Sequence, residues 1–384
     1  MNKLNLPVVK FTKEHLEFRN EVRNFILKEK EAGGFETRCD SWLSGYSVEF
    51  SKKLGDQGWI GMTWPKKYGG EERSAIERYI VIEELLAAGA PVAAHWFADR
   101  QTGPQLLKYG TEEQKNFFLP KIAKGRCYFA IGLSEPNSGS DLASISTRAE
   151  RTENGWILNG SKIWSSGAHY SHYMVVLCRT SSKDPNNRHS GLSHLIVDLQ
   201  SPGVTVRPIK YLTGESHFNE VFFESAFIPL ENLIGDEGNG WKQSMSELAY
   251  ERSGPERILS TFPLLEELFR VLKEQNNIEG LRQAIKVLAR LDAYRKMSLG
   301  VAQYLEEDKD VSISASLVKD LGTQVEKEIV EVTRLIIDAS PSIQADDNLN
   351  KFLAESILHS PGFTLRGGTT EILRGIVTKG LISS

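Results

Sequence analysis

The sequence has few cysteines and no long hydrophobic run, and each shortage excludes a class of protein. The chain has 384 residues and three cysteines, Cys39, Cys127 and Cys178, too few and too scattered for a disulfide framework or a closed zinc site. No stretch approaches the roughly 18 apolar residues of a membrane span. The N-terminus shows neither a secretion signal nor a transit pattern. We therefore expect a cytoplasmic protein without a membrane anchor, whose cysteines lie in the core.

An excess of charge of one sign is absent too. The 46 basic and 50 acidic residues leave a net charge of -4, so no general field recruits nucleic acid or an anionic membrane. The sequence also lacks a G-x-G-x-x-G motif, a P-loop, internal repeats and low-complexity tracts. A nucleotide-containing ligand would need a local site of another kind.

The hydrophobic pattern changes period twice along the chain. Apolar residues recur at helical spacing from residue 11 to about 127, at a period of two from about 128, and at helical spacing again after the glycine-rich loop at 235–240. Thr111 is a typical helix N-cap, and Asn154-Gly155 is a typical hairpin turn. The pattern predicts an α+β protein. Its expected domains are a helical N-terminal domain (1–127), a central β domain (128–235) and a helical C-terminal domain (236–384).

Two motifs lie in the central block. The first runs Leu-Ser-Glu-Pro-Asn-Ser-Gly-Ser-Asp from Leu133 to Asp141, and the second runs Lys-Ile-Trp-Ser-Ser-Gly from Lys162 to Gly167. Taken alone, the first could be a surface turn, and Trp164 could be a packed core residue. At this spacing the pair resembles the T-E-P-x-A-G-S-D and K-x-W-I-T motifs of the acyl-CoA dehydrogenases, which bind FAD.

The resemblance extends over the whole chain and implies a fold and a set of cofactor contacts. The fold would be a helical N-terminal domain, a central β-barrel-like domain and a C-terminal four-helix bundle. The stretch from Gly367 to Arg374 resembles the family's terminal G-G-T-x-E-I-x-R turn, although Gly367-Gly368 could be merely a helix cap. The implied FAD-binding residues are Leu133, Ser134, Ser140, Trp164, Ser166, Thr369 and Glu371.

The catalytic base departs from the commonest family pattern. Gly367 occupies the place where many members carry the catalytic glutamate, and glycine has no side chain to abstract a proton. Members of the isovaleryl-CoA type place the glutamate in a Glu-Arg pair after the β domain. Glu251-Arg252 matches that pair, so the resemblance implies Glu251 as the base, with Glu247 one turn earlier as the alternative. Without the resemblance, Glu251-Arg252 would be a solvated charge pair.

Other site residues follow from the same resemblance. The backbone N–H of Gly367 would still bind the thioester oxygen, and Ser140 and Arg252 would contact the substrate. A glycine at position 367 also leaves room for a branched or bulky acyl group. No metal site is expected, because His169 and His172 lack partners at ligand spacing and are read as surface or packing residues.

Two family motifs are missing from the sequence. Homo-oligomeric members carry R-x-x-F-G and Q-x-x-G-G-x-G, which reach a neighbouring subunit's FAD, and neither occurs here. The chain is therefore expected to need a second acyl-CoA dehydrogenase-like subunit to complete its FAD site.

The function implied is FAD-dependent dehydrogenation of an acyl-CoA to the 2-enoyl-CoA, with electrons passed to an electron-transfer flavoprotein. Two alternatives stay open. One is a flavin oxidase or monooxygenase on the same fold, and the other is a non-catalytic partner subunit.

Overall fold

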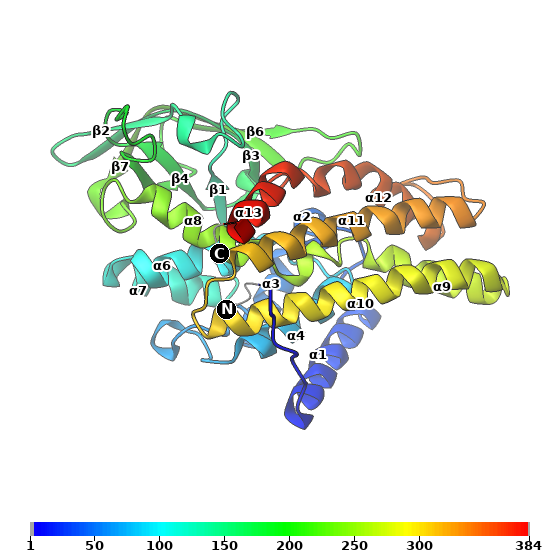
Figure 1. Ribbon diagram of the computed structural model, residues 1–384. Helices are drawn as coiled ribbons and strands as arrows, with labels where there is room; N and C mark the ends of the chain where they lie inside the picture. Colours follow the sequence, from blue (N-terminus) through cyan, green and yellow to red (C-terminus); the bar gives the residue numbers. More distant parts are fainter. Residues whose placement is uncertain (1–3, 383–384) are drawn as a thin grey trace. The chain divides into compact units, whose positions relative to one another are not determined.

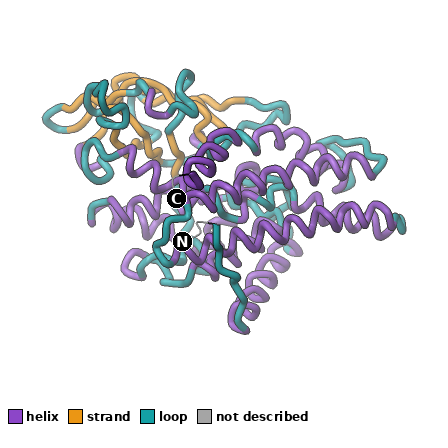
Figure 2. Tube along the Cα trace, in the orientation of Figure 1, coloured by secondary structure: helices purple, strands orange, loops and turns teal. Residues whose placement is uncertain are grey.

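The computed structural model describes residues 4–382, except for the side chains of residues 247–251. The chain forms two compact units. The first comprises Met1–Tyr46, Arg73–Val92 and Ala249–Ser384, and the second comprises Ser47–Glu72 and Ala93–Leu248. Helices come first along the chain, strands follow and helices return (Figures 1 and 2), which confirms the predicted α+β class.

The second unit is built on a seven-stranded sheet in the order β1-β4-β2-β3-β7-β6, with β5 paired to β4. Strands β2 and β3 form an antiparallel hairpin in which Arg151 pairs with Trp156, so the predicted hairpin is confirmed. The loop spans 152–155, and neither Asn154 nor Gly155 has the positive φ expected of a tight Asn-Gly turn. The strands are β1 (Phe129–Gly132), β2 (Arg148–Arg151), β3 (Gly155–Ser166), β4 (Tyr173–Arg179), β5 (Leu192–Asp198), β6 (Val204–Ile209) and β7 (Phe218–Pro229).

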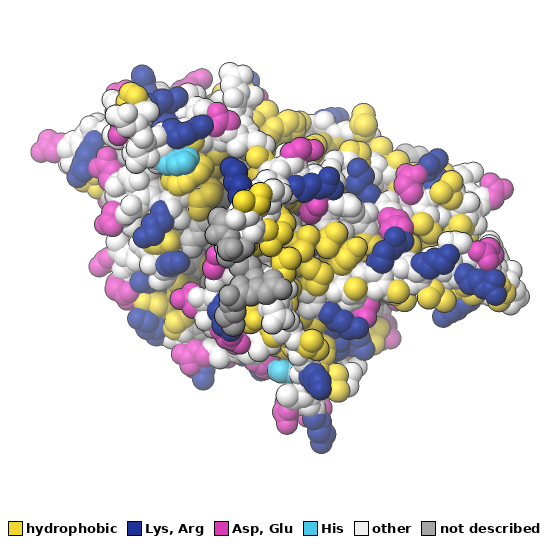
Figure 3. Space-filling model, in the orientation of Figure 1, with side chains coloured by type: hydrophobic (Ala, Val, Ile, Leu, Met, Phe, Trp, Pro, Cys, Tyr) yellow, Lys and Arg dark blue, Asp and Glu magenta, His cyan; other side chains and the backbone are white. Residues whose placement is uncertain are grey.

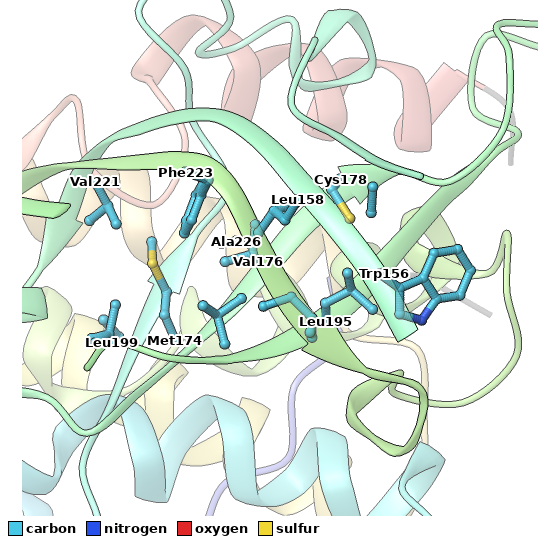
Figure 4. Packing of buried hydrophobic residues seen from close by; sticks show 14 of the residues in the cluster. Trp156, Leu158, Met174, Val176, Cys178, Leu195, Leu199, Val221, Phe223 and Ala226 are labelled. Atoms are coloured by element: carbon cyan, nitrogen blue, oxygen red, sulfur yellow. The ribbon is translucent and has the colours of Figure 1, made fainter. Parts of the chain in front are cut away.

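Side chains from one face of this sheet form a continuous apolar core (Figure 4). Trp156 and Leu158 of β3 pack with Val176 of β4 and Phe223 of β7, and each is at most 2% exposed. Burying a side chain of this size stabilises the fold by about 1.5–3 kcal/mol. This core fixes β3, the strand that carries the second predicted cofactor motif.

The second unit also contains short helices, which precede and follow the strands in sequence. Thr111 caps α7 by accepting from the backbone N–H of Gln114 at 3.2 Å, as predicted. The α-helices are α3 (Val48–Asp56), α5 (Ala93–Phe97), α6 (Gly103–Tyr109), α7 (Glu112–Ala123) and α8 (Gly240–Glu251). A π-helical segment, η2, spans Ala98–Thr102, and single 3₁₀ turns are η1 (Lys66–Tyr68), η3 (Leu142–Ser144), η4 (Ala168–Tyr170) and η5 (Leu230–Asn232).

The first unit is helical, and its long helices α10, α11 and α12 run side by side (Figure 1). The Glu83 carboxylate of α4 forms a salt bridge with the Arg19 guanidinium of α1 at 2.6 Å, and it also pairs with Arg295 of α10. These contacts link three helices. The elements are α1 (Lys13–Glu31), α2 (Ser41–Ser44), α4 (Ala75–Ala87), η6 (Pro255–Arg257), α9 (Phe262–Glu274), α10 (Ile278–Glu306), α11 (Ser312–Ile336), α12 (Asn348–Phe363) and α13 (Thr370–Ile382).

The distribution of charge on the surface and the burial of the cysteines match what the composition predicts. Basic and acidic side chains are interspersed on the face seen in Figure 3. Cys39, Cys127 and Cys178 are buried, and burial raises the thiol pKa of Cys127 and Cys178 to about 12. Within residues 4–382, no helix combines the length and apolarity that a membrane crossing requires.

Candidate functional site

The two motifs of the central block lie against each other in the second unit. The backbone N–H of Ile163 donates to the carbonyl oxygen of Ser134 at 2.9 Å, and the Lys162 ammonium donates to the carbonyl oxygen of Leu133 at 3.0 Å. The Leu133–Ser134 segment is therefore held beside β3, immediately before Trp164. Segments about thirty residues apart in sequence become one continuous surface.

A buried ion pair holds this arrangement. The Lys162 ammonium lies 2.8 Å from the Glu135 carboxylate, and their side chains are 0% and 5% exposed. Glu135 also accepts from the backbone N–H groups of Ser146, at 2.7 Å, and Thr147, at 2.9 Å. Burial by itself would raise the pKa of Glu135, but the Lys162 charge and these hydrogen bonds lower it to about 2. Burial lowers the pKa of Lys162, and the Glu135 charge opposes that shift. The Lys162 ammonium donates both to Glu135 and to the carbonyl oxygen of Leu133, so the pair ties the two motifs together.

Trp164 projects from a bulge in β3. The register of β3 against β7 shifts between Lys162 and Ser165, and Trp164 has φ 61°, in the left-handed region. Its side chain is 55% exposed, so the interpretation of Trp164 as a packed core residue is wrong. The ring meets Phe218 edge-to-face at 6.0 Å between centroids. A β-bulge commonly re-aims one side chain, and here it presents a large aromatic face to the outside.

This surface has the features that a flavin ring requires. The exposed Trp164 ring offers a planar apolar face, and the half-buried hydroxyls of Ser134 and Ser166 lie on the two segments that flank it. The loop beyond is shaped by a tight turn in which Glu135 and Ser138 exchange backbone hydrogen bonds at 2.9 and 3.0 Å. Ser140 follows on the exposed side of that loop. The residues present therefore fit a flavin.

The remaining predicted residues belong to the first unit, where Arg252 and Gly367 are brought together. The Arg252 Nε donates to the carbonyl oxygen of Gly367 at 3.4 Å across 115 positions of sequence. Gly367 and Gly368 have φ 68° and 100° and form the turn between α12 and α13. The C-cap of α12 is Thr364, so the glycine pair does not cap that helix.

Thr369 and Glu371 open α13. The Thr369 hydroxyl accepts from the backbone N–H of Ile372 at 3.4 Å, and Glu371 is exposed in the first helical turn. Hydrogen bonds from its own backbone and from Thr369 lower the pKa of Glu371. A polar group at this end of a helix meets the positive end of the helix dipole.

The two candidate bases lie at the C-terminal end of α8. Glu247 and Glu251 are in the last turns of α8, and both side chains lie outside the described residues. The backbone of α8 ends at Glu251, next to the Arg252 that reaches Gly367. Both assignments stay predictions.

The two histidines behave as surface and packing residues. His169 is exposed, whereas the His172 ring stacks on Tyr128 at 5.3 Å and its Nδ1 accepts from the Tyr128 backbone N–H at 3.1 Å.

Three charged residues at the glycine turn were not predicted. Arg366 donates to both carboxylate oxygens of Asp40 at 2.7 Å, and its guanidinium lies 4.4 Å from the centre of the Trp42 ring. Lys319 of α11 is 0% exposed, and its ammonium donates to the carbonyl oxygen of Gly368 at 2.8 Å. Lys319 lies on the apolar stripe of α11 with Ala315. A lysine in such a stripe is the sequence signal that could have identified it.

Comparisons with known proteins agree along the chain. Residues 12–126 match the model of the acyl-CoA dehydrogenase N-terminal domain, and residues 130–226 match that of the middle domain. The acyl-CoA dehydrogenase IpdE1 of Mycolicibacterium smegmatis is 31% identical over 94% of this chain and 96% of that protein.

Solved structures give the same result. The Tcur3481-Tcur3483 steroid ACAD superposes with a TM-score of 0.85 at 28% identity, covering 98% of both chains. A chain of the ChsE4-ChsE5 complex from Mycobacterium tuberculosis gives 0.83 at 27% identity, covering 98% of this chain and 99% of that one. Both structures are named as pairs of different proteins.

Proposed function

Because this chain belongs to the acyl-CoA dehydrogenase family of oxidoreductases, we propose that it is a subunit that dehydrogenates an acyl-CoA thioester to the 2-enoyl-CoA with FAD as cofactor. The observation that carries the cofactor assignment is the exposed Trp164 ring beside the Leu133–Ser134 segment. When bound, FAD would supply the oxidant that takes the β-hydride.

The cofactor would be held by residues of two kinds. Trp164 would cover the flavin ring, while Ser134 and Ser166 would donate hydrogen bonds to its polar edge, with Leu133 and Ser140 completing the contact. Fixed donors stabilise the charge that reduction places on the ring without further reorganisation. Thr369 and Glu371, at the start of α13, would contact the rest of the cofactor.

Proton abstraction is assigned to Glu251, with Glu247 as the alternative. Bound flavin and acyl chain would desolvate this carboxylate and raise its pKa, which would bring it closer to the acidity of the thioester α-proton. The N–H of Gly367 would donate to the thioester oxygen and stabilise the enolate charge as it develops. Arg252 would lie near the same thioester, since its side chain reaches the carbonyl of Gly367.

The substrate is proposed to be a branched or bulky acyl-CoA, because Gly367 replaces a glutamate side chain. The similar solved structure named as a steroid ACAD is consistent with a large acyl group. The absence of the two family motifs that reach a neighbour's FAD supports a hetero-oligomer. Both compared structures are pairs of different proteins, which points in the same direction. An electron-transfer flavoprotein is the proposed electron acceptor.

A single anaerobic experiment tests this function. The holoenzyme, with any partner chain that co-purifies, is mixed with butyryl-, isobutyryl-, octanoyl- and palmitoyl-CoA and with a CoA thioester of a steroid side chain, and flavin bleaching is followed. We expect at least one thioester to bleach the flavin, with transfer of electrons to an electron-transfer flavoprotein. If none does, the dehydrogenase function is wrong; if bleached flavin reoxidises rapidly in air without an acceptor, the oxidase alternative holds.

The base is tested by a matched pair of variants. Glu251→Gln keeps the size of the side chain but removes the proton acceptor, so bleaching should be abolished while FAD content is unchanged. Glu247→Gln is the control and should retain bleaching. If Glu247→Gln abolished bleaching and Glu251→Gln retained it, Glu247 would be the base.

A further inference from the structure

Two cationic side chains donate to successive carbonyl oxygens of the turn between α12 and α13, and the cationic residue that precedes these carbonyls is itself held by a carboxylate. The Arg366 guanidinium donates to the Asp40 carboxylate. Arg252 donates to the carbonyl oxygen of Gly367, and Lys319 donates to that of Gly368. We propose that Lys319 is a positioning residue that fixes the Gly367–Gly368 turn for binding of the thioester oxygen. This inference rests on the proposed function.

The need for such a restraint follows from the residues in the turn. Glycine has the greatest backbone freedom of any residue, and two glycines in succession lose the most entropy when they are fixed. A hydrogen-bond donor that stabilises a developing charge must be held within about 0.5 Å of its productive position. A Gly-Gly donor segment can be this rigid only if other groups hold it.

The contacts hold the peptide planes on both sides of Gly368. All peptide bonds of the described chain are trans, so the C=O and N–H of one peptide point in opposite directions. Lys319 fixes the plane between Gly368 and Thr369, and Arg252 fixes the plane between Gly367 and Gly368. The N–H groups of these two planes belong to Gly368 and Thr369. The N–H of Gly367 lies in the preceding plane, with the carbonyl of Arg366, so Lys319 restrains it through the chain and not through its own peptide. On the other side, the Asp40 contact anchors Arg366, so Gly367 lies between two restrained groups.

The burial of Lys319 makes its contact with the turn energetically important. Its side chain is 0% exposed, and removing an ammonium group from water costs several kcal/mol. An apolar side chain of the same length would fill the same volume without this cost. A donor at 2.8 Å to the Gly368 carbonyl gives the buried charge a directional task that methionine cannot perform.

The test compares Lys319→Met, which keeps the volume, with Lys319→Arg, which keeps the charge. Lys327→Met on the exposed side of the same helix is the control. Backbone hydrogen exchange of residues 362–373, measured by mass spectrometry without substrate, should become about tenfold faster in Lys319→Met and remain unchanged in Lys327→Met, because only the former releases the turn. Exchange at the wild-type rate in Lys319→Met would overturn the proposal.

The second readout uses the thioester that bleaches wild-type flavin fastest. The bleaching rate at saturation should fall by about 10²-fold in Lys319→Met, as for a displacement of about 1 Å, with little change in the half-saturating concentration. The isotope effect of the 2,2-dideuterated thioester should rise, because proton abstraction becomes more rate-limiting. Lys319→Arg should recover part of the rate.

The outcomes separate this inference from the proposed function. If none of the thioesters bleaches the flavin of the wild-type protein, the proposed function is wrong. The hydrogen-exchange experiment then still decides whether Lys319 holds the turn. If wild-type protein works but Lys319→Met loses only thermal stability, with an unchanged isotope effect, Lys319 is merely structural and the inference is wrong.

Discussion

Replacing Lys162 by methionine should destabilise the protein strongly, because the substitution leaves the buried Glu135 carboxylate without its cation. Lys162 is 0% exposed and lies 2.8 Å from that carboxylate. Methionine matches the stem of lysine in length, so the variant removes the charge without opening a large cavity. The change therefore isolates the ion pair.

The expected magnitude follows from the pKa of Glu135. Its pKa falls from the ordinary 4.5 to about 2 in the folded protein, which corresponds to about 3 kcal/mol of stabilisation at neutral pH. Removing one partner of a buried pair costs about 3–5 kcal/mol in general, in agreement with this value. We expect Lys162→Met to lower the free energy of unfolding by about 3 kcal/mol.

The pH dependence has a definite sign. Because the folded pKa of Glu135 is lowered, its stabilisation is fully present above about pH 4.5 and is lost as the pH falls toward about 2. The difference between wild type and Lys162→Met should therefore shrink across that acidic range.

Urea unfolding followed by far-UV circular dichroism measures the effect, with Glu135→Gln and the double variant completing a cycle. The double variant should be more stable than the sum of the single losses predicts, because it contains no unpaired buried charge. FAD affinity should also fall in Lys162→Met, since the same ammonium holds the carbonyl of Leu133. A loss below about 1 kcal/mol, or strictly additive single variants, would refute the account of this pair.

Two further predictions concern the first unit. Asp40→Asn should cost about 3 kcal/mol in urea unfolding, because it breaks the buried pair with Arg366; asparagine tolerates the φ of 55° at this position, so a wild-type midpoint would show that the pair is not stabilising. Burial raises the pKa of Glu326 to about 7, so its contribution is present below about pH 4.5 and is lost as the pH rises through about 7. Glu326→Gln should therefore become more stable relative to wild type over that range in thermal melts, and parallel pH profiles of the two proteins would contradict this.

Local chemistry made much of the fold predictable. The change from helical spacing to a period of two indicated the sheet, and the hairpin before Trp156 and the cap at Thr111 were identified from residue types alone. These features depend on neighbours in sequence, where steric and hydrogen-bonding preferences act directly.

Long-range contacts were harder to predict. Nothing near Lys319 indicates that its ammonium will meet Gly368, and nothing near Asp40 indicates Arg366, because such pairs arise only when distant segments pack. The bulge at Trp164 was missed for a related reason. A period-two pattern predicts a strand, but it does not reveal which residue is left out of the pairing.

The left-handed backbone of Trp164 has a consequence for how this sequence can change. A bulky residue at φ 61° costs of order 1–3 kcal/mol of backbone strain, which glycine would avoid. Selection for stability alone would thus replace the tryptophan, while selection for the cofactor would retain it. Under the proposed function these two pressures oppose each other at position 164, so a lineage that no longer binds the cofactor should lose this side chain.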